Sequence, residues 1–304
     1  MSKLAANTAE AYQKAGQIAA EVRSRARRLV DVNTRIVDIC ENVENWIREL
    51  GGSPAFPCNV SINEIAAHYT SPLRDPRIIP ERSIVKVDIG VHVDGYIADT
   101  AVTICLNPEY RRLVTAAEES LQAGIDIMKA GVRAYEVGAV IERKIRDYGL
   151  KPIWNLTGHM VSRYNLHAGQ VIPNVHSLLN RQRLNVGDVY AVEPFTTLPS
   201  ATGEVINGEV GHIHLFLRKR PVKKDRVKEM MNYILASYKS LPFAERWVFS
   251  RFSDQDSIAS FGELLRSKCL YSYPTLVEKS KSLVGQAEHT VLVKEDGCQV
   301  LTEL

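Results

Sequence analysis

Two aspartates, Asp88 and Asp99, are the side chains of this sequence that most directly predict chemistry. The Asp94-Gly95 dipeptide between them is typical of a two-residue type I′ turn that joins antiparallel strands. In that register Gly90 lies opposite Asp99, so the two aspartates share one face of a hairpin as diagonal neighbours, roughly 7–8 Å apart at most. Two carboxylates this close repel, and one would stay protonated unless a cation lay between them. The spacing therefore predicts a metal site.

Four further residues are candidates to complete this site. His159 stands at the end of an apolar segment, and His167 follows eight residues later, although either histidine alone is more often structural. Glu193 and Glu288 both lie in apolar strand-like segments, where a carboxylate is costly unless it is paired. Taken alone, each Glu is explained equally well by a position at a strand end or by an ion pair. Two Asp, two Glu and one His form an oxygen-rich set suited to two divalent ions bridged by carboxylates, which can activate water.

The composition limits the fold classes and partners that this chain can have. The 304 residues are 45% hydrophobic and 24% charged, which fits one large α/β or α+β domain or two smaller ones. A net charge of +3 is too mild to predict a nucleic-acid or anionic-membrane partner. Five cysteines without a CxxC pair indicate reduced thiols, and neither a signal peptide nor a long apolar run is present. We therefore expect a cytoplasmic protein that no membrane segment anchors.

Periodicity and breakers predict where helices and strands lie. Apolar residues at helical spacing predict helices at about 7–30, 34–50, 107–130 and 134–148. Alternating or apolar segments predict strands at 153–156, 169–172, 188–197, 288–295 and 298–303. The residues of roughly 222–270 are charged and helical in pattern. A β core interrupted late by a helical insertion is the simplest organisation.

The C-terminal residues form a second predicted hairpin. If Asp296-Gly297 is its two-residue turn, Val293 lies opposite Val300. The final residues of the chain then pair with the strand that begins just after Glu288. We therefore expect the C-terminus beside the predicted metal site.

A set of motifs, in this order, resembles the type 2 methionine aminopeptidases in the form found in archaea. The matching segments are Ala55-Phe-Pro57, Ala66-Ala-His-Tyr-Thr70, Val87-Asp-Ile-Gly90, Ile97-Ala-Asp-Thr-Ala101, Gly158-His159 with Leu166-His-Ala-Gly169, Ala191-Val-Glu-Pro-Phe195 and Gln286-Ala-Glu-His-Thr290. The resemblance implies an α/β (α+β) pita-bread fold, in which two pseudo-symmetric halves of curved antiparallel sheet and flanking helices enclose a dinuclear metal site. It implies one catalytic domain over 1–304 with an inserted helical subdomain at about 210–272.

The resemblance also implies a ligand set for two divalent ions, which this donor chemistry allows to be Co, Mn, Fe or Zn. Asp88 would chelate one ion, Asp99 and Glu288 would bridge both, and His159 and Glu193 would bind the other. A bridging water or hydroxide would be the nucleophile, and Glu193 would also accept its proton.

The resemblance also implies which residues contact the substrate. His68 and His167 would contact the scissile amide, and Phe56, Tyr273 and Leu276 would line the methionine pocket. The implied activity is removal of the initiator methionine from nascent proteins that have a small second residue.

Two alternative functions remain at this point. One is a proline-directed aminopeptidase of the same fold, and the other is a metal-free binding protein that kept the fold. We expect a monomer. The basic run 218–226 has two interpretations, a transient contact with the ribosome or a simple solvated surface. The sequence assigns no role to His92, His212 or His214.

Overall fold

The predicted aspartate hairpin is present in the computed structural model, which describes residues 6–304. Strands β4 (Ile84–Val93) and β5 (Tyr96–Cys105) are antiparallel, with Gly90 opposite Asp99 as predicted. The Asp94-Gly95 turn has positive φ at both residues, 52° and 89°, which is the type I′ geometry. A local turn therefore sets the register of the strands that carry the two aspartates.

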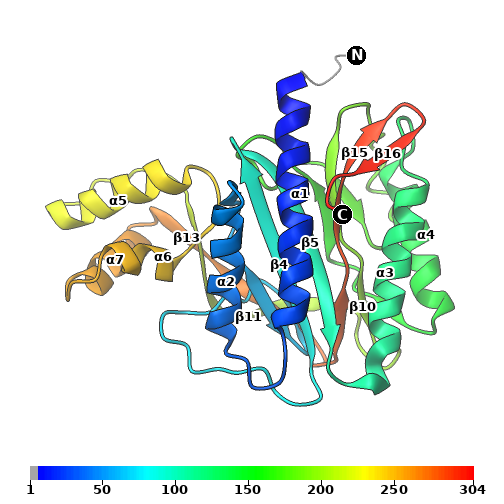
Figure 1. Cartoon of the computed structure of the whole chain (residues 1–304), viewed down its shortest axis with the longest axis horizontal. Coiled ribbons are helices and arrows are strands. Elements are labelled where there is room, and N and C mark those ends of the chain that lie inside the picture. Colours follow the sequence, from blue (N-terminus) through cyan, green and yellow to red (C-terminus); the bar gives the residue numbers. More distant parts are fainter. Residues whose placement is uncertain (1–5) are drawn as a thin grey trace.

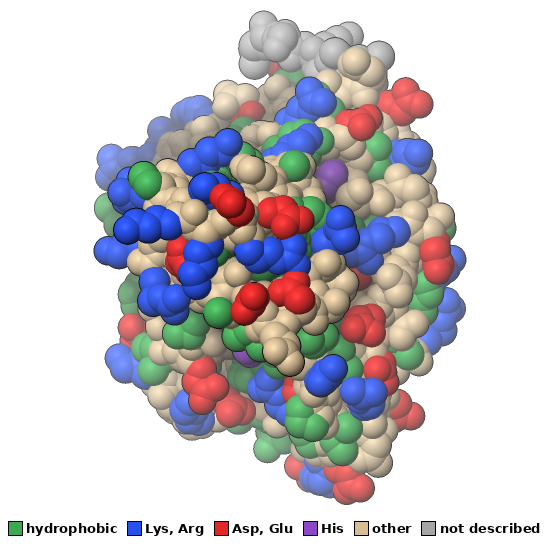
Figure 2. Space-filling view, turned by 90° about the vertical axis from the view of Figure 1, so that its left-hand side faces the viewer, with side chains coloured by type: hydrophobic (Ala, Val, Ile, Leu, Met, Phe, Trp, Pro, Cys, Tyr) green, Lys and Arg blue, Asp and Glu red, His purple; other side chains and the backbone are tan. Residues whose placement is uncertain are grey.

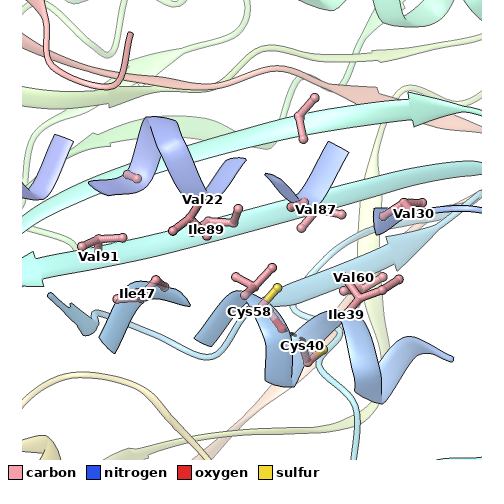
Figure 3. Close-up of a cluster of buried hydrophobic side chains, with 14 of the residues drawn as sticks. Val22, Val30, Ile39, Cys40, Ile47, Cys58, Val60, Val87, Ile89 and Val91 are labelled. Carbon is pink, nitrogen blue, oxygen red and sulfur yellow. Dashed lines mark hydrogen bonds between the residues drawn. The ribbon is translucent and has the colours of Figure 1, made fainter. Parts of the chain in front are cut away.

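The first half of the molecule is a sheet covered by two helices (Figure 1). Strand β4 pairs with β5 on one side and with β1 (Ser53–Pro54) and β2 (Asn59–Ile62) on the other. Helices α1 (Ala6–Leu29) and α2 (Ile36–Glu49) cover the face that carries the alternating apolar residues. Figure 3 shows this core, which includes Val22, Ile39, Ile47, Val60, Val87, Ile89 and Val91. The opposite face of β4, which carries Asp88, is left for the site.

The second half repeats the plan of sheet and helices. One of its sheets has the order β14-β10-β6 and the other β16-β15-β9-β7-β8. Their strands are β6 (Lys151–Pro152), β7 (Thr157–Met160), β8 (Val171–Pro173), β9 (Val189–Val192), β10 (Phe195–Thr197), β14 (Val284–Gln286), β15 (His289–Lys294) and β16 (Gly297–Val300). A short 3-10 turn (Pro108–Tyr110) leads into α3 (Arg111–Asp126), which packs with α4 (Ala134–Asp147) against these sheets.

A helical segment stands to one side of the two halves (Figure 1). It consists of α5 (Asp225–Tyr238), α6 (Glu245–Arg251) and α7 (Ser257–Arg266), with a separate apolar core. Strands β11 (Val205–Phe216) and β13 (Leu270–Glu278) connect this segment to the rest of the chain. They belong to a sheet with the order β12-β11-β13-β3, whose other strands are β12 (Phe243–Ala244) and β3 (Ile65–Ala67). Figure 2, which views the molecule from this side, shows many Lys and Arg side chains on its surface.

A buried ion pair ties this helical segment to the first half. Arg246 of α6 and Glu44 of α2 pair while only 3% and 2% exposed. Glu44 also accepts a hydrogen bond from the Trp247 indole at 2.7 Å, and Arg246 donates to the Thr70 hydroxyl at 2.9 Å. Because removing one member of a buried pair leaves a charge without its partner, this contact is costly to break.

Two strand predictions are wrong in detail. The predicted strand 153–156 is not one, because Ile153 and Trp154 donate to the separate carbonyls of Phe195 and Gly203, and the chain bends between β6 and β7. The predicted strand 188–197 is divided after Val192, since Pro194 has no N–H to donate.

The register of the C-terminal hairpin is also corrected. Val293 lies opposite Cys298 rather than Val300, so the turn is Glu295-Asp296. A shift of two residues keeps every side chain on its face, and the apolar pattern cannot distinguish the two registers. The expected position of the tail is confirmed, because the Leu301 N–H donates to the Thr290 carbonyl at 2.8 Å. None of the described helices is long and apolar enough to cross a membrane.

Candidate metal centre

All ten residues that the sequence singles out line one cavity of about 300 Å³. They come from both halves of the molecule and from β13 of the sheet beside the helical segment. The residues are Phe56, His68, Asp88, Asp99, His159, His167, Glu193, Tyr273, Leu276 and Glu288.

Five of these residues form a buried acidic cluster, which we call the carboxylate cluster. Asp88 lies on β4 and Asp99 on β5, whereas His159 lies on β7, Glu193 follows β9 and Glu288 precedes β15. The His159 Nε2 atom is 3.6 Å from Asp99 Oδ2 and 3.6 Å from Glu193 Oε1. Asp99, His159 and Glu288 each offer one ligand atom, and these three atoms lie within 4.8 Å of one another. Elements far apart in sequence thus bring their donors to one point.

The electrostatics of the cluster favour a bound cation. Burial raises the pKa of Asp88 to about 7, and burial together with neighbouring carboxylates raises the pKa values of Asp99, Glu193 and Glu288 well above their usual range. Burial lowers the pKa of His159 to about 3, so its imidazole is neutral and can act as a ligand. The buried Oδ1 atoms of Asp88 and Asp99 have no hydrogen-bond partner among the described residues. The donor set therefore fits divalent metal.

A threonine holds the backbone of Asp99 in place. The Thr290 hydroxyl accepts from the Asp99 N–H and donates to the Asp99 carbonyl, both at 2.7 Å. The Thr100 hydroxyl donates to the Glu288 carbonyl at 2.8 Å, so each of these strands carries a hydroxyl that fixes the other. The Gln286 amide lies 3.4 Å from a Glu193 oxygen and 3.5 Å from a Glu288 oxygen. All three residues lie in the motif segments quoted above, but sequence reasoning assigned them no role, since a Thr or Gln in a strand does not by itself indicate what it binds.

The chain's tail continues this network. The buried Thr302 hydroxyl accepts from the Thr290 N–H at 3.1 Å and forms a hydrogen bond with His289 Nδ1 at 2.8 Å. Arg23 of α1 donates to the same His289 nitrogen at 3.1 Å and also to the Thr100 hydroxyl. The first helix and the last residues therefore both support the strands that carry Asp99 and Glu288.

Two more histidines lie beside the cluster. The His167 ring centroid is 4.5 Å from that of His159, and the His68 ring meets the Tyr273 ring edge-on at 5.4 Å. His68 has φ of 65°, a left-handed conformation that is unusual for a residue with a side chain. Burial and the nearby His167 lower the pKa of His68 to about 4, and burial lowers the pKa of His167. Both imidazoles are therefore neutral near pH 7.

A glycine makes room for the apolar wall of the cavity. A Cβ atom at Gly90 would lie only 2.2 Å from the Phe56 ring, so Phe56 packs directly on the hairpin beside Asp88. The remaining histidines do not belong to the described lining of the cavity. His92 accepts from the Gly95 N–H of the turn, while His212 and His214 both contact Glu245 of α6.

Residues 10–219 match the family described as metallopeptidase family M24. The methionine aminopeptidase of Methanocaldococcus jannaschii is 46% identical over 297 residues, which are 97% of this chain and 99% of that relative. The chain belongs to metallopeptidase family M24. M24 membership carries a divalent metal cofactor with it, in agreement with the donor chemistry of the carboxylate cluster.

Solved structures give the same fold for this M24 chain. The methionine aminopeptidase of Thermotoga maritima superposes with a TM-score of 0.70 at 22% identity and covers the whole of both chains. The structure of a thermophilic Arx1 superposes with a TM-score of 0.82 at 16% identity, covering 99% of this chain and 91% of the other. The predicted α/β pita-bread fold is confirmed.

Proposed function

We propose that this M24 chain is a methionine aminopeptidase that removes the N-terminal methionine from nascent polypeptides with a small second residue. One observation carries the proposal: a buried carboxylate cluster and an apolar wall line the same cavity. The cluster accounts for hydrolysis and the wall for selectivity toward an uncharged side chain. The relative with 46% identity over nearly the whole chain carries the name of this activity.

The proposed cofactor is a pair of divalent ions, with Co, Mn, Fe and Zn all compatible with the ligands. Asp88 would chelate one ion, Asp99 and Glu288 would serve both, and His159 and Glu193 would hold the other. Bound divalent ions polarise a scissile carbonyl and lower the pKa of water. Support comes from the buried, unpaired oxygens of Asp88 and Asp99.

Three side chains are assigned proton transfer and positioning. Glu193, whose pKa burial raises, would accept the proton of the attacking water and pass it to the leaving amine. His68 and His167, neutral at pH 7, would donate hydrogen bonds to the scissile amide as charge develops there. Both histidines line the cavity next to the cluster, within reach of a group bound there.

Phe56, Tyr273 and Leu276 are the proposed methionine pocket. A thioether side chain gains packing against these surfaces, whereas burying an unpaired charge there costs several kcal/mol. Cleavage should therefore be confined to peptides that begin with methionine.

A cellular location, an oligomeric state and a partner are also proposed. We assign it to the cytoplasm as a monomer, with residues of about 210–272 as an inserted subdomain. The exposed basic run 218–226 would permit a transient contact with the ribosome, where nascent chains emerge.

The test is hydrolysis by the metal-reconstituted protein of Met-Ala-Ser, compared with X-Pro and proline-initial peptides. We expect rapid cleavage of Met-Ala-Ser only, and none of a Lys-Ala-Ser or Glu-Ala-Ser control. Faster cleavage of X-Pro peptides would favour the proline-directed alternative. No cleavage with any of the four metals would favour a metal-free binding protein.

A further inference from the structure

Strand β11 has an open edge next to the cavity. Strand β13 pairs with it along one side, from Val205 to Phe216. On the other side β12 pairs only with Ile213 and His214, and no other strand of the described chain covers 206–212. An open edge presents unpaired backbone N–H and C=O groups, to which another chain can pair.

Both ends of this open edge lie at or beside residues that line the cavity. At one end the Asn155 amide exchanges two hydrogen bonds with the backbone of Val205, at 2.8 and 2.9 Å. At the other end Ile213 lies opposite Ala244, shortly after Pro242. Asn155, Ile213 and Pro242 all line the cavity. The open edge therefore runs between two walls of the cavity.

The contacts of Val205 show which backbone groups face outward. Its N–H and C=O both point to Asn155, away from β13. Backbone groups of alternate residues point to the same edge of a strand, so Asn207 presents its N–H and C=O in the same direction. Asn207 lies opposite Leu276, which lines the cavity. A bulge then interrupts the ladder between Asn207 and Val210, which limits regular pairing to a short stretch.

The side chains here leave the edge accessible and partly apolar. The sequence of 206–212, Ile-Asn-Gly-Glu-Val-Gly-His, contains neither lysine nor proline, the residues that commonly block pairing at edges. Ile206 is 42% exposed, and Val210 is 75% exposed. Trp154, which is 55% exposed, donates its backbone N–H to Gly203 on the same side.

We propose that the open edge of β11 at Asn207 binds the backbone of the substrate beyond its second residue, as a short added strand. This inference rests on the proposed function. Nascent chains differ in every side chain after the second, so the backbone is the one group that all of them offer. Backbone pairing at Asn207, with apolar contact from Ile206 and Trp154, binds an extended peptide without sequence preference.

The test compares Met-Ala-Ser with Met-Ala-Ser-Ala-Ser-Ala under identical metal loading. The longer peptide should have a KM about tenfold lower, the effect expected of one or two backbone hydrogen bonds, with kcat little changed. N-methylation of single amides in the longer peptide should abolish this gain at one position of residues 3 to 5 and spare its neighbours. Equal KM values for both peptides, or equal effects at all methylated positions, would overturn the proposal.

A variant pair locates the effect. Asn207→Pro removes the outward N–H and should raise the KM of the longer peptide to that of Met-Ala-Ser, while Asn207→Ala keeps the N–H and should behave as wild type. If Asn207→Pro does not fold, the N-methyl series on the wild-type protein decides. Failure of the proposed function is a separate result, because the wild-type protein would then not cleave Met-Ala-Ser.

Discussion

Replacing Thr302 by valine tests how the tail supports the carboxylate cluster. Valine matches threonine in shape, so Thr302→Val removes a hydroxyl without opening a cavity. The N–H of buried Thr290 then loses its acceptor at 3.1 Å, and His289 keeps only the Arg23 contact at 3.1 Å. A buried donor left unsatisfied costs about 1–3 kcal/mol, so the free energy of unfolding should fall by that amount.

The same change should weaken metal binding. The Thr290 hydroxyl binds both the N–H and the carbonyl of Asp99, so a shift of this strand moves a proposed ligand. Loss of a residue that orients ligands commonly costs about 10–100-fold in metal affinity, and we expect the lower end of that range. Deleting Leu301–Leu304 should be more severe, since it also removes the buried Leu301 side chain, worth about 2–5 kcal/mol.

Two measurements check this prediction. Urea unfolding of the metal-free protein gives the change in stability, and competition with a chelator gives the metal affinity. Thr302→Ser keeps the hydroxyl and is the matched control. It should keep the wild-type metal affinity and lose only about 0.8 kcal/mol of stability, for one buried methyl group. Wild-type stability and metal affinity in Thr302→Val would show that the tail does not support the site.

Four further predictions concern the cavity. Asp99→Asn should lose at least one metal and nearly all turnover, so two bound ions by atomic emission with normal cleavage of a Met-Ala peptide would contradict its assignment. His68→Ala and His167→Ala should keep both metals while kcat falls by about 10²–10⁴, and metal loss in either variant would indicate a different role. Gly90→Ala places a Cβ atom 2.2 Å from the Phe56 ring, so KM for methionine peptides should rise about tenfold at unchanged metal content; an unchanged KM would remove Phe56 from the pocket. The metal-free protein should lose stability as pH rises from about 4, where the unfolded carboxyl groups ionise, to about 7 and above, because the buried carboxyl groups have folded-state pKa values raised above their unfolded values, one of them to about 7. Saturating divalent metal should abolish that loss, and denaturation curves that are flat with pH in the metal-free protein would argue against the raised pKa values.

The sequence by itself determined the hairpin of β4 and β5 and the face on which its two aspartates lie. The Asp94-Gly95 turn fixes the pairing locally, and a period of two then places Asp88 and Asp99 on one face. Helices that end at strong local signals, such as α2 before Gly51-Gly52, were predictable for the same reason. Residue types suggested His159, His167, Glu193 and Glu288, and the resemblance supplied the remaining candidates. All of them line the same cavity.

Long-range packing decided what the pattern left ambiguous. The C-terminal hairpin has two registers that keep the same faces, and the tail's hydrogen bonds to Thr290 accompany the observed one. Lys86 is fully buried, and its ammonium group donates to the carbonyl of Asn63, in the turn after β2, and to that of Val284 in β14. Likewise, Glu44 and Arg246 are 202 residues apart, and neither has a local signal that predicts the other.

The difference between the features that the sequence determined and those that long-range packing decided has a physical origin. A turn or a cap depends on a few consecutive residues, whose conformational preferences the sequence displays directly. A buried charge or a strand register depends on partners that only the folded chain brings close, and its free energy is a balance of desolvation against those partners. Sequence therefore determined which side chains could bind metal, and the tertiary structure determined which threonines, arginine and tail residues hold them in position.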